Sequence, residues 1–503
     1  MSRQHPALPR QHSAAGLPSE VSSHSFWHSQ PSPLLTAHRS TRNLPQTADV
    51  VVIGSGITGA SAAHHLLTSS KNDTHSSGLK VVMLEAREAC WGATGRNGGH
   101  CQPLLFESPH DPSIGHFELR NFHALQDLIK EENIDCEFVA QPGVRSIYSQ
   151  HHLDETIMAL KTMEETAPEL HAMMRLVTSK EDLARYRIPT AEGALVTTVA
   201  ARMWPYKLVA HILSSLLTST ELSGSLNLQT LTPVTAVTPA ESNGWTVSTP
   251  RGPIQAQKVI LATNAYTSHL LPSFADLIVP CRGQMSALEP LPSVSGDHRL
   301  KSSLGFLGDG LDDYLIQRPN ERGGHLMFGG GRQHGPSIGV TDDSVVDPAT
   351  AQYLRSRLVD ALSLPEGKAV EFKAAAEWSG IMGFSRDERP WVGPVPGVAP
   401  GLFVSAGYTG HGMPNTWLCG KAVALMVLKS SEYPADPEWA VEVAAGEVGL
   451  PASYRLTAER MVSATKIEGV EQKDWAEMER GRVGGDGRRT AGSETSRPPS
   501  GYA

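Results

Sequence analysis

Residues 48 to 67, ADVVVIGSGITGASAAHHLL, join a short apolar run, a glycine-rich turn and a stretch rich in helix formers. The apolar run from 50 to 53 is continuous and β-branched, which is typical of a strand buried on both faces of a parallel sheet. A helix is expected from about Ile57 to Leu67. A strand, a bare turn and a helix in this order predict the first unit of a doubly wound α/β fold.

The turn itself matches the pattern G-x-G-x-x-G at Gly54, Gly56 and Gly59. In such a unit the first glycine makes the turn, the second lets a pyrophosphate approach the backbone, and the third lets the helix lie close to the strand. The free N–H groups and the positive dipole end of the helix then face that phosphate. A second strand, LKVVMLE, ends in Glu85, whose carboxylate is placed to accept hydrogen bonds from a ribose and would repel a 2′-phosphate.

Glu85 lies further from the turn than usual, and the polar insertion SSKNDTHSSG at 69–78 explains the difference as a loop between helix and strand. The alternative is a tight glycine turn without any ligand. The adenosine half is common to NAD and FAD, so this unit alone does not choose between them.

The overall composition is that of a globular protein, with 503 residues, 40% hydrophobic and 19% charged. No run of 18 or more apolar residues occurs, so we expect no membrane span. The net charge of −9 argues against nucleic acid or anionic lipid as a partner. Five scattered cysteines without a CxxC pair predict reduced thiols in an intracellular protein, with no disulfide framework and no metal site.

Both ends of the sequence differ from the middle. Residues 1–45 are basic, hold Glu20 as their one acidic residue and contain prolines that break a long helix. We interpret them as an extended arm whose Trp27 packs on the core, in a cytoplasmic protein; a mitochondrial targeting segment is the alternative. The end of the chain, 473–503, is polar and glycine-rich and is expected to be disordered.

Two later stretches favour a flavin. The loop AREACWGATGRNGGHCQP, directly after Glu85, is rich in glycine and suits close passage of backbone along an extended ligand. Far along the chain, GLFVSAGYTGHGMPNTWLCGKAVALMVL reads as a buried strand, a glycine turn and an apolar helix with Pro414 in its first turn. This is a second helix start preceded by bare backbone, and a helix start near a flavin stabilises negative charge on the reduced ring.

The chain resembles the FAD-dependent amine and amino-acid oxidoreductases of the D-amino-acid oxidase and glycine oxidase-like superfamily, nearest to the γ-glutamylputrescine oxidase-like branch. The resemblance rests on VVIGSGITGASAAHHL, MLEA, GATGRNGGH, VILATNAYT, RGQM, WSGIMGFSRDERPWVG and SAGYTGHGM, in the family's order. It implies an α/β fold in which a Rossmann-like FAD-binding domain is interleaved with a substrate domain built on a mainly antiparallel sheet.

The domain division that follows assigns five parts to the chain. They are an extended N-terminal arm (1–45), an FAD-binding domain (46–103 with 196–280 and 375–430), a substrate domain (104–195 with 281–374), a C-terminal extension (431–472) and a disordered tail (473–503).

The resemblance also implies which residues hold FAD. The first turn would bind the pyrophosphate, Glu85 the ribose, Val234 the adenine, the 94–99 loop the ribityl chain and ring, and the 410–413 turn the pyrimidine edge. The full set is Gly54, Ser55, Gly56, Ile57, Thr58, Gly59, Glu85, Ala86, Arg87, Thr94, Gly95, Arg96, Asn97, Gly98, Gly99, Val234, Ala262, Thr263, Asn264, Gly380, Gly407, Gly410, His411, Gly412 and Met413.

The sequence departs from its relatives at positions that carry chemistry. Cysteine-linked relatives attach flavin where this chain has Gly380, and histidine-linked ones where it has Arg96, so we expect non-covalent FAD, although His100 is near. Met382 stands where glycine oxidase-like enzymes clamp a carboxylate with arginine, which favours an amine, a modified polyamine or an N-substituted substrate. Met327 stands where sarcosine oxidases carry a lysine that assists oxygen, so oxidase and dehydrogenase both stay open.

The predicted activity is oxidation of a C–N bond of an amine, a modified polyamine or an N-substituted amino acid, by hydride transfer to flavin N5 and hydrolysis of the imine. Such a site must favour the neutral amine. His411, Gln284 and Tyr314 are the catalytic candidates, with Arg96 and His100 as further polar groups. The alternatives are an NAD-dependent dehydrogenase and a non-catalytic flavin-binding protein.

Two helices are expected in the substrate domain, at 116–131 and 153–165, where apolar residues recur with charges between them. They are interpreted as amphipathic surface elements, and their charged residues as solvated faces rather than binding groups.

Overall fold

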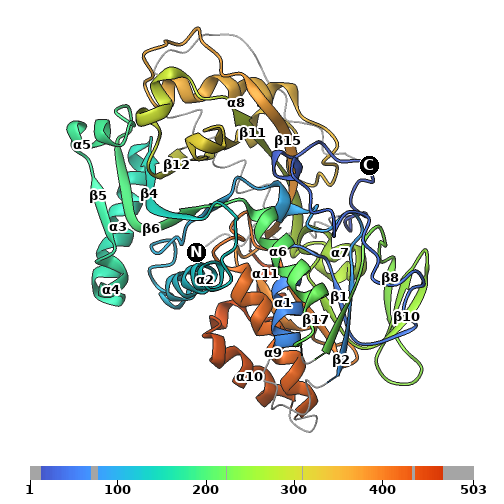
Figure 1. The fold of residues 1–503 in the computed structure, drawn as a ribbon. Coiled ribbons are helices and arrows are strands. Elements are labelled where there is room, and N and C mark those ends of the chain that lie inside the picture. The colour runs from blue at the N-terminus through green and yellow to red at the C-terminus, as the bar shows by residue number, and fades with distance from the viewer. Residues whose placement is uncertain (1–12, 69–77, 223, 309, 433–436, 468–503) are drawn as a thin grey trace, which may run out of the picture.

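The computed structural model describes residues 13–68, 78–222, 224–308, 310–432 and 437–467, and it contains two large sheets in separate lobes (Figure 1). The first sheet has eight strands, of which six follow the order β16–β17–β10–β1–β2–β7 and two, β8 and β9, form a hairpin against β10. Their bounds are β1 (Thr47–Ile53), β2 (Leu79–Leu84), β7 (Gly224–Gln229), β8 (Ala236–Pro239), β9 (Trp245–Thr249), β10 (Gly252–Leu261), β16 (Trp391–Pro394) and β17 (Leu402–Ala406).

The five strands from β17 to β7 are parallel, and the middle strand β1 is buried on both faces. Val50 and Val52 belong to one hydrophobic core, whereas Val51 and Ile53 belong to a second core on the opposite face. Side chains alternate between the faces of a strand, so a continuous β-branched run supplies both cores. The strand predicted from that run is therefore confirmed.

Helices cover one face of this sheet, in the lower lobe of Figure 1. Helix α1 (Ile57–Thr68) packs closely on α9 (Thr416–Glu432). Gly420 permits this close contact, since a Cβ at that position would lie 2.6 Å from Cβ of Ser61. Helix α6 (Pro205–Thr218) packs beside α1 and α10 (Pro437–Val448) lies on α9. The remaining helices are α2 (Ser113–Glu131), α3 (Gln150–Thr166), α4 (Pro168–His171), α5 (Lys180–Arg185), α7 (Thr267–Leu270), α8 (Pro348–Ala361) and α11 (Ala458–Ala464).

The second sheet has nine strands, in the order β15–β11–β14–β13–β12–β4–β6–β3, with β5 paired to β6. Their bounds are β3 (His100–Cys101), β4 (Val139–Ile147), β5 (Met174–Val177), β6 (Gly193–Arg202), β11 (Ile278–Leu288), β12 (Ser303–Gly308), β13 (Leu311–Gln317), β14 (Leu326–Gly330) and β15 (Ala374–Ser385). All pairs are antiparallel except β4 with β12. The predicted fold class is confirmed with one correction, since this parallel pair makes the sheet mixed.

Several predicted bounds shift in the structure. The helices expected at 116–131 and 153–165 are α2 and α3, and both begin three residues earlier. The second apolar helix begins at Thr416 rather than at Pro414, because residues 413–415 form a turn. The N–H of Thr416 donates to the carbonyl of Gly412 across this turn. The insertion at 69–77 and the predicted disordered tail lie outside the described residues.

The N-terminal arm, described from residue 13, forms hydrogen bonds with β15 of the second sheet and β7 of the first, and buried side chains hold it in place. Trp27 is fully buried and contacts Trp204, and Leu35 is buried as well. Nε1 of Trp27 donates to the carbonyl of Asn97, 2.5 Å away, and Ser25 Oγ donates to the carbonyl of Gly95. The arm therefore holds the loop that follows Glu85.

Within the described ranges, no helix has the length and apolar character needed to cross a bilayer. All five cysteines are buried and free of disulfides. The domain bounds given above remain a prediction, because sheet membership does not fix them.

Candidate functional site

A cavity of about 650 Å³ lies between the two sheets and receives residues from both glycine turns. Gly54 and Gly56 line it from the start of α1, and Gly410 and Gly412 line it from the turn before α9. The two helix starts, more than 350 residues apart in sequence, thus open into one space. Parallel strands place their carboxyl ends at one edge of a sheet, which is where ligands bind in such folds.

The first turn can be made only with glycine at two positions. A Cβ on Gly54, whose φ is +106°, would lie 2.5 Å from the carbonyl oxygen of Ala262, and a Cβ on Gly59 would lie 1.9 Å from that of Gly54. Gly56 faces the cavity, with Thr94 Oγ1 as the nearest atom to its missing side chain. The backbone at Gly56 is therefore accessible to a ligand, whereas Gly54 and Gly59 pack directly against neighbouring backbone.

Glu85 follows β2 directly and lines the same cavity. Its Oε2 accepts from the backbone and hydroxyl of Ser55, at 3.0 and 2.6 Å, and its Oε1 accepts from the backbone N–H of Arg87 at 3.0 Å. Each carboxylate oxygen has two lone pairs, so Oε1 retains room for a hydroxyl donor such as a ribose would offer.

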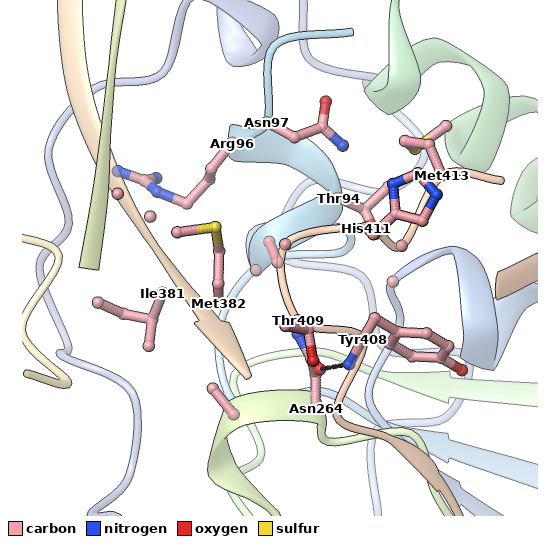
Figure 2. A pocket seen from close by; sticks show the side chains of 18 of the residues that line it. Thr94, Arg96, Asn97, Asn264, Ile381, Met382, Tyr408, Thr409, His411 and Met413 are labelled. Carbon is pink, nitrogen blue, oxygen red and sulfur yellow. Dashed lines mark hydrogen bonds between the residues drawn. The ribbon is translucent and has the colours of Figure 1, made fainter. Parts of the chain in front are cut away.

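The loop from 92 to 99 passes along the cavity, with Arg96 and Asn97 among its lining residues (Figure 2), but the guanidinium of Arg96 is bound by other parts of the protein. Its Nε donates to the carbonyl of Ser379 at 2.6 Å, and a second nitrogen donates to the carbonyl and hydroxyl of Ser23 in the arm. Asp343 is fully buried and pairs with both Arg96 and Arg87. Burial lowers the pKa of Arg96 to about 10, so the guanidinium stays charged. The side chain therefore anchors the loop.

The second glycine turn is tied to the end of β10 by one amide. Oδ1 of Asn264 accepts from the backbone N–H groups of Gly407 and Tyr408, at 3.0 and 3.4 Å (Figure 2). Gly407 and Gly410 have φ of +79° and +72°, and Thr409 has a φ of +50°. Positive φ at three of four positions makes a tight turn that favours glycine, and the turn presents its backbone to the cavity.

His411 lines the cavity and is held from behind by a buried acid. Its Nε2 lies 3.1 Å from the carboxylate of Glu118 on α2, whose side chain is only 4% exposed. Glu118 also accepts from the backbone N–H of Leu104 at 2.7 Å and from Nδ2 of Asn415 at 3.1 Å. A carboxylate only accepts hydrogen bonds, so Nε2 of His411 carries a proton.

On the side of the second sheet, Tyr314 packs against the loop. A Cβ on Gly98 would lie 2.3 Å from Cε2 of Tyr314, whose hydroxyl lies 3.1 Å from the sulfur of Met285. His100 stacks near Tyr314 and contacts Gln102 through Nε2 at 2.9 Å. Burial lowers the pKa of His100 to about 4, so the imidazole is neutral near neutral pH.

Most of the predicted residues line the cavity, including His411, Tyr314 and Gln284. Gln284 has its amide engaged, since it donates to the carbonyl of Asp347 and accepts from its N–H. Five of the predicted set do not line it: Ser55, Gly59, Gly95, Gly99 and Gly407. Met327 is fully buried and does not line it either. The functional roles of all these residues stay predictions.

Sequence reasoning missed Glu118, which it interpreted as part of a solvated face. The signal was present: Ile114, Glu118, Asn121 and Leu125 follow the helical spacing of the buried stripe of α2. A carboxylate in an apolar stripe needs a partner, here His411. Asp343 was also missed, and its place in an irregular segment before α8 gives no periodic signal.

Comparison with known proteins gives a consistent family. A family model described as "FAD dependent oxidoreductase" matches residues 49–426. The chain is similar to gamma-glutamylputrescine oxidoreductase of Escherichia coli, at 24% identity over 78% of this chain and 86% of that protein. It is similar to glycine oxidase of Pseudomonas aeruginosa at 27% identity, over 72% of this chain and 90% of that protein.

Among solved structures the fold resembles glycine oxidase from Geobacillus kaustophilus, with a TM-score of 0.61 and 20% identity over 76% of this chain and 95% of that one. It also resembles an L-proline dehydrogenase from P. horikoshii, with a TM-score of 0.60 and 19% identity over 76% and 94% of the two chains. These likenesses describe the fold.

The geometry fits FAD. Bare backbone at Gly56 beside the α1 start suits a pyrophosphate, and Oε1 of Glu85 can still accept from a ribose hydroxyl. Val234 is buried at the edge of the cavity, where it offers an apolar surface. A cavity that continues to the second glycine turn has room for an extended dinucleotide rather than a mononucleotide.

Proposed function

The chain belongs to the family of FAD-dependent oxidoreductases, and from that premise we propose that it oxidises a C–N bond of an amine, a modified polyamine or an N-substituted amino acid. FAD is its cofactor. The proposal is supported by what its relatives are named for, since gamma-glutamylputrescine and glycine both carry an amine nitrogen next to an oxidisable carbon.

One observation carries the proposal. One cavity is lined both by Gly54 and Gly56 of the first glycine turn and by Tyr314 and His100 of the second sheet. A cofactor held along the turns would therefore share its space with a substrate lying against that sheet. When bound, FAD supplies a hydride acceptor at N5 of its ring.

The residues around the substrate space favour a neutral amine, which hydride loss from the α-carbon requires. Met285, Ile381 and Met382 line the cavity with apolar side chains, and the Tyr314 ring adds to this apolar surface. An apolar surrounding disfavours the ammonium form because it removes the solvation of the charge. The neutral imidazole of His100 can accept a hydrogen bond there. The imine product hydrolyses in water to a carbonyl compound and an amine.

Met382 supports an amine rather than a simple α-amino acid. Its side chain lines the cavity (Figure 2). A Cβ placed on the neighbouring Gly283 would lie 2.8 Å from the Met382 methyl carbon. An arginine at this position would pair with a carboxylate through two parallel hydrogen bonds, and a thioether cannot. A carboxylate directly on the oxidised carbon therefore has no cation at this position.

The experiment is anaerobic mixing of the purified flavoprotein with a panel of amines, polyamines and N-substituted amino acids while the flavin absorption is followed. Bleaching by members of the panel supports the proposal, and readmission of oxygen separates an oxidase, which recovers its colour at once, from a dehydrogenase. A flavin that no C–N compound reduces would contradict it.

A further inference from the structure

The face of the second sheet that borders the cavity carries one row of aligned residues. Arg145 on β4 pairs in register with Gly305 on β12, and Gly305 pairs with Tyr314 on β13. Residues paired across neighbouring strands point to the same face. Tyr314 faces the cavity, and Arg145 and Gly305 line it too. The row thus forms one floor with a large side chain at each end and bare backbone between them.

The bare position is open space. A Cβ placed on Gly305 would meet only the Cγ of Arg145, at 3.9 Å, and no other atom within 4 Å. Gly305 does not have a positive φ, so its backbone conformation does not require glycine. The missing side chain therefore leaves a recess in the floor, bounded by the arginine on one side and the tyrosine on the other.

Arg145 has donors left for a ligand. One of its terminal nitrogens donates to the carboxylate of Glu107, and its guanidinium lies 5.1 Å from the ring centre of Phe106. In the described part of the chain no further hydrogen bond of this guanidinium is found. Glu107 does not line the cavity, and its side chain is 41% exposed.

The charges of the other arginines that line the cavity are neutralised by carboxylates at or near the cavity. Arg87 and Arg96 share the buried Asp343, and Nε of Arg332 lies 2.5 Å from the carboxylate of Asp312. Asp312 lines the cavity itself, so it cancels the charge of Arg332 where a substrate would meet it. Arg145, by contrast, lines the cavity while its paired acid, Glu107, does not.

We propose that Arg145, above the recess at Gly305, binds a carboxylate that the substrate carries at the end distant from the oxidised carbon. A planar guanidinium with unused donors suits a carboxylate, which it can bind through two parallel hydrogen bonds. Arg145 and Tyr314 lie two strand spacings apart, or about 10 Å. A substrate that reaches both therefore has its carboxylate several bonds from its amine, which agrees with Met382 in place of a clamp beside the oxidised carbon.

This inference rests on the proposed function for what is oxidised, but its first test needs no turnover. The holoenzyme is titrated with valerate and with glutarate, and the visible flavin spectrum reports binding; valeramide, which is uncharged, is the matched control. Carboxylate binding with no response to valeramide is expected. Arg145→Gln should weaken the binding of valerate about tenfold or more, and Arg145→Lys should weaken it less.

Glu107→Gln is the control for the alternative that Arg145 has only a structural role. If Arg145 served only to pair with Glu107, both variants would change the protein alike. The inference instead predicts that Glu107→Gln leaves carboxylate affinity unchanged or raises it, because a competing acceptor is removed. Thermal midpoints and flavin content of both variants establish that they fold. Failure of valerate and glutarate to bind, or equal affinity in Arg145→Gln, overturns the inference.

A kinetic comparison separates this inference from the proposed function. δ-Aminovalerate and n-pentylamine differ only in the terminal carboxylate. The inference predicts a lower KM for δ-aminovalerate than for pentylamine, and loss of that difference in Arg145→Gln with little change in kcat. Equal KM values with normal flavin reduction would overturn the carboxylate site and leave amine oxidation standing. If neither amine reduced the flavin while the protein still bound valerate, the carboxylate site would stand and amine oxidation would be contradicted.

Discussion

Nε2 of His411, at the cavity, lies 3.1 Å from the carboxylate of Glu118, which belongs to a helix of a different sequence region. The pair joins the second glycine turn to α2. The same carboxylate accepts hydrogen bonds from the backbone N–H of Leu104 and from Nδ2 of Asn415. The acid thus fixes both the protonated nitrogen of His411 and the position of the turn. His411 itself lines the cavity, and no hydrogen bond of its Nδ1 is found in the described part of the chain.

Glu118→Gln should destabilise the protein by about 1–3 kcal/mol, because an amide cannot accept all three hydrogen bonds and places a donor against a donor. Reduction of the flavin by substrate should also slow. Thermal denaturation and anaerobic rapid mixing measure the two effects. If the acid acts on the rate through His411, the substitution should change the rate little in a His411→Asn background. An equal slowing in both backgrounds would contradict this.

Gly59→Ala should abolish retention of FAD. The added Cβ would lie 1.9 Å from the carbonyl oxygen of Gly54, so α1 must move away from β1, and the backbone that we predict to bind the pyrophosphate would be displaced. The ratio of flavin to protein absorbance after gel filtration measures the effect. Gly446→Ala is the matched control: no atom lies within 4 Å of its Cβ, and alanine favours a helix. Normal flavin content in Gly59→Ala would contradict the assignment of this turn.

Trp27→Ala should destabilise the protein by about 3–5 kcal/mol and weaken FAD binding. The indole is fully buried, and its N–H holds the carbonyl of Asn97 in the loop along the cavity. Isothermal titration of the apoprotein with FAD measures the affinity. Val21→Ala, in the same arm but 75% exposed, should change neither quantity. Unaltered FAD affinity in a Trp27→Ala protein that still folds would show that the arm does not position the loop.

His28 should make the protein sensitive to acid. Burial, aided by the charge of Arg96, lowers its pKa from 6.5 to about 3. Below about pH 6.5 the unfolded chain takes up a proton that the folded chain refuses, so stability falls as pH drops towards 3. Between about pH 6.5 and pH 4.5 the loss is about 2–3 kcal/mol.

The check on His28 is a comparison with His28→Gln, which cannot titrate. Thermal denaturation of both proteins at about pH 7 and about pH 4.5 should show their stabilities converging in acid, because only the wild type pays for protonation. A stability difference that does not change with pH would contradict a buried neutral imidazole. A difference that widens in acid would mean the reverse sign of the pKa shift.

The part of the cavity that we predict to hold the nucleotide could be recognised from the sequence because its signals are local. Gly54, Gly56 and Glu85 follow from strand, turn and strand end, and each lies where the motif places it, with Gly56 and Glu85 facing the cavity. The arm was predicted to pack Trp27, since an aromatic residue in an otherwise polar segment needs a burial site.

The part of the cavity that we propose for the substrate was less accessible to sequence analysis because it depends on register between strands far apart in the chain. Arg145 and Tyr314 share a face only because β12 lies between β4 and β13, and the parallel pairing of β4 with β12 breaks the antiparallel pattern that we expected. Arg96 shows the opposite limit: its place in the loop was predicted, but its binding to Ser23 and Ser379 needed the arm and β15 to be positioned.

The central claim is that substrate lies against the second sheet and gives up hydride from the carbon next to its nitrogen. Its most direct test is single-turnover reduction of the bound flavin under anaerobic conditions, with an amine that the panel identifies and with the same amine deuterated at the α-carbon. Deuteration should slow the bleaching several-fold, and the carbonyl product should appear in equal amount to the flavin reduced. Bleaching unaffected by deuterium and without a carbonyl product would contradict C–N oxidation in this cavity.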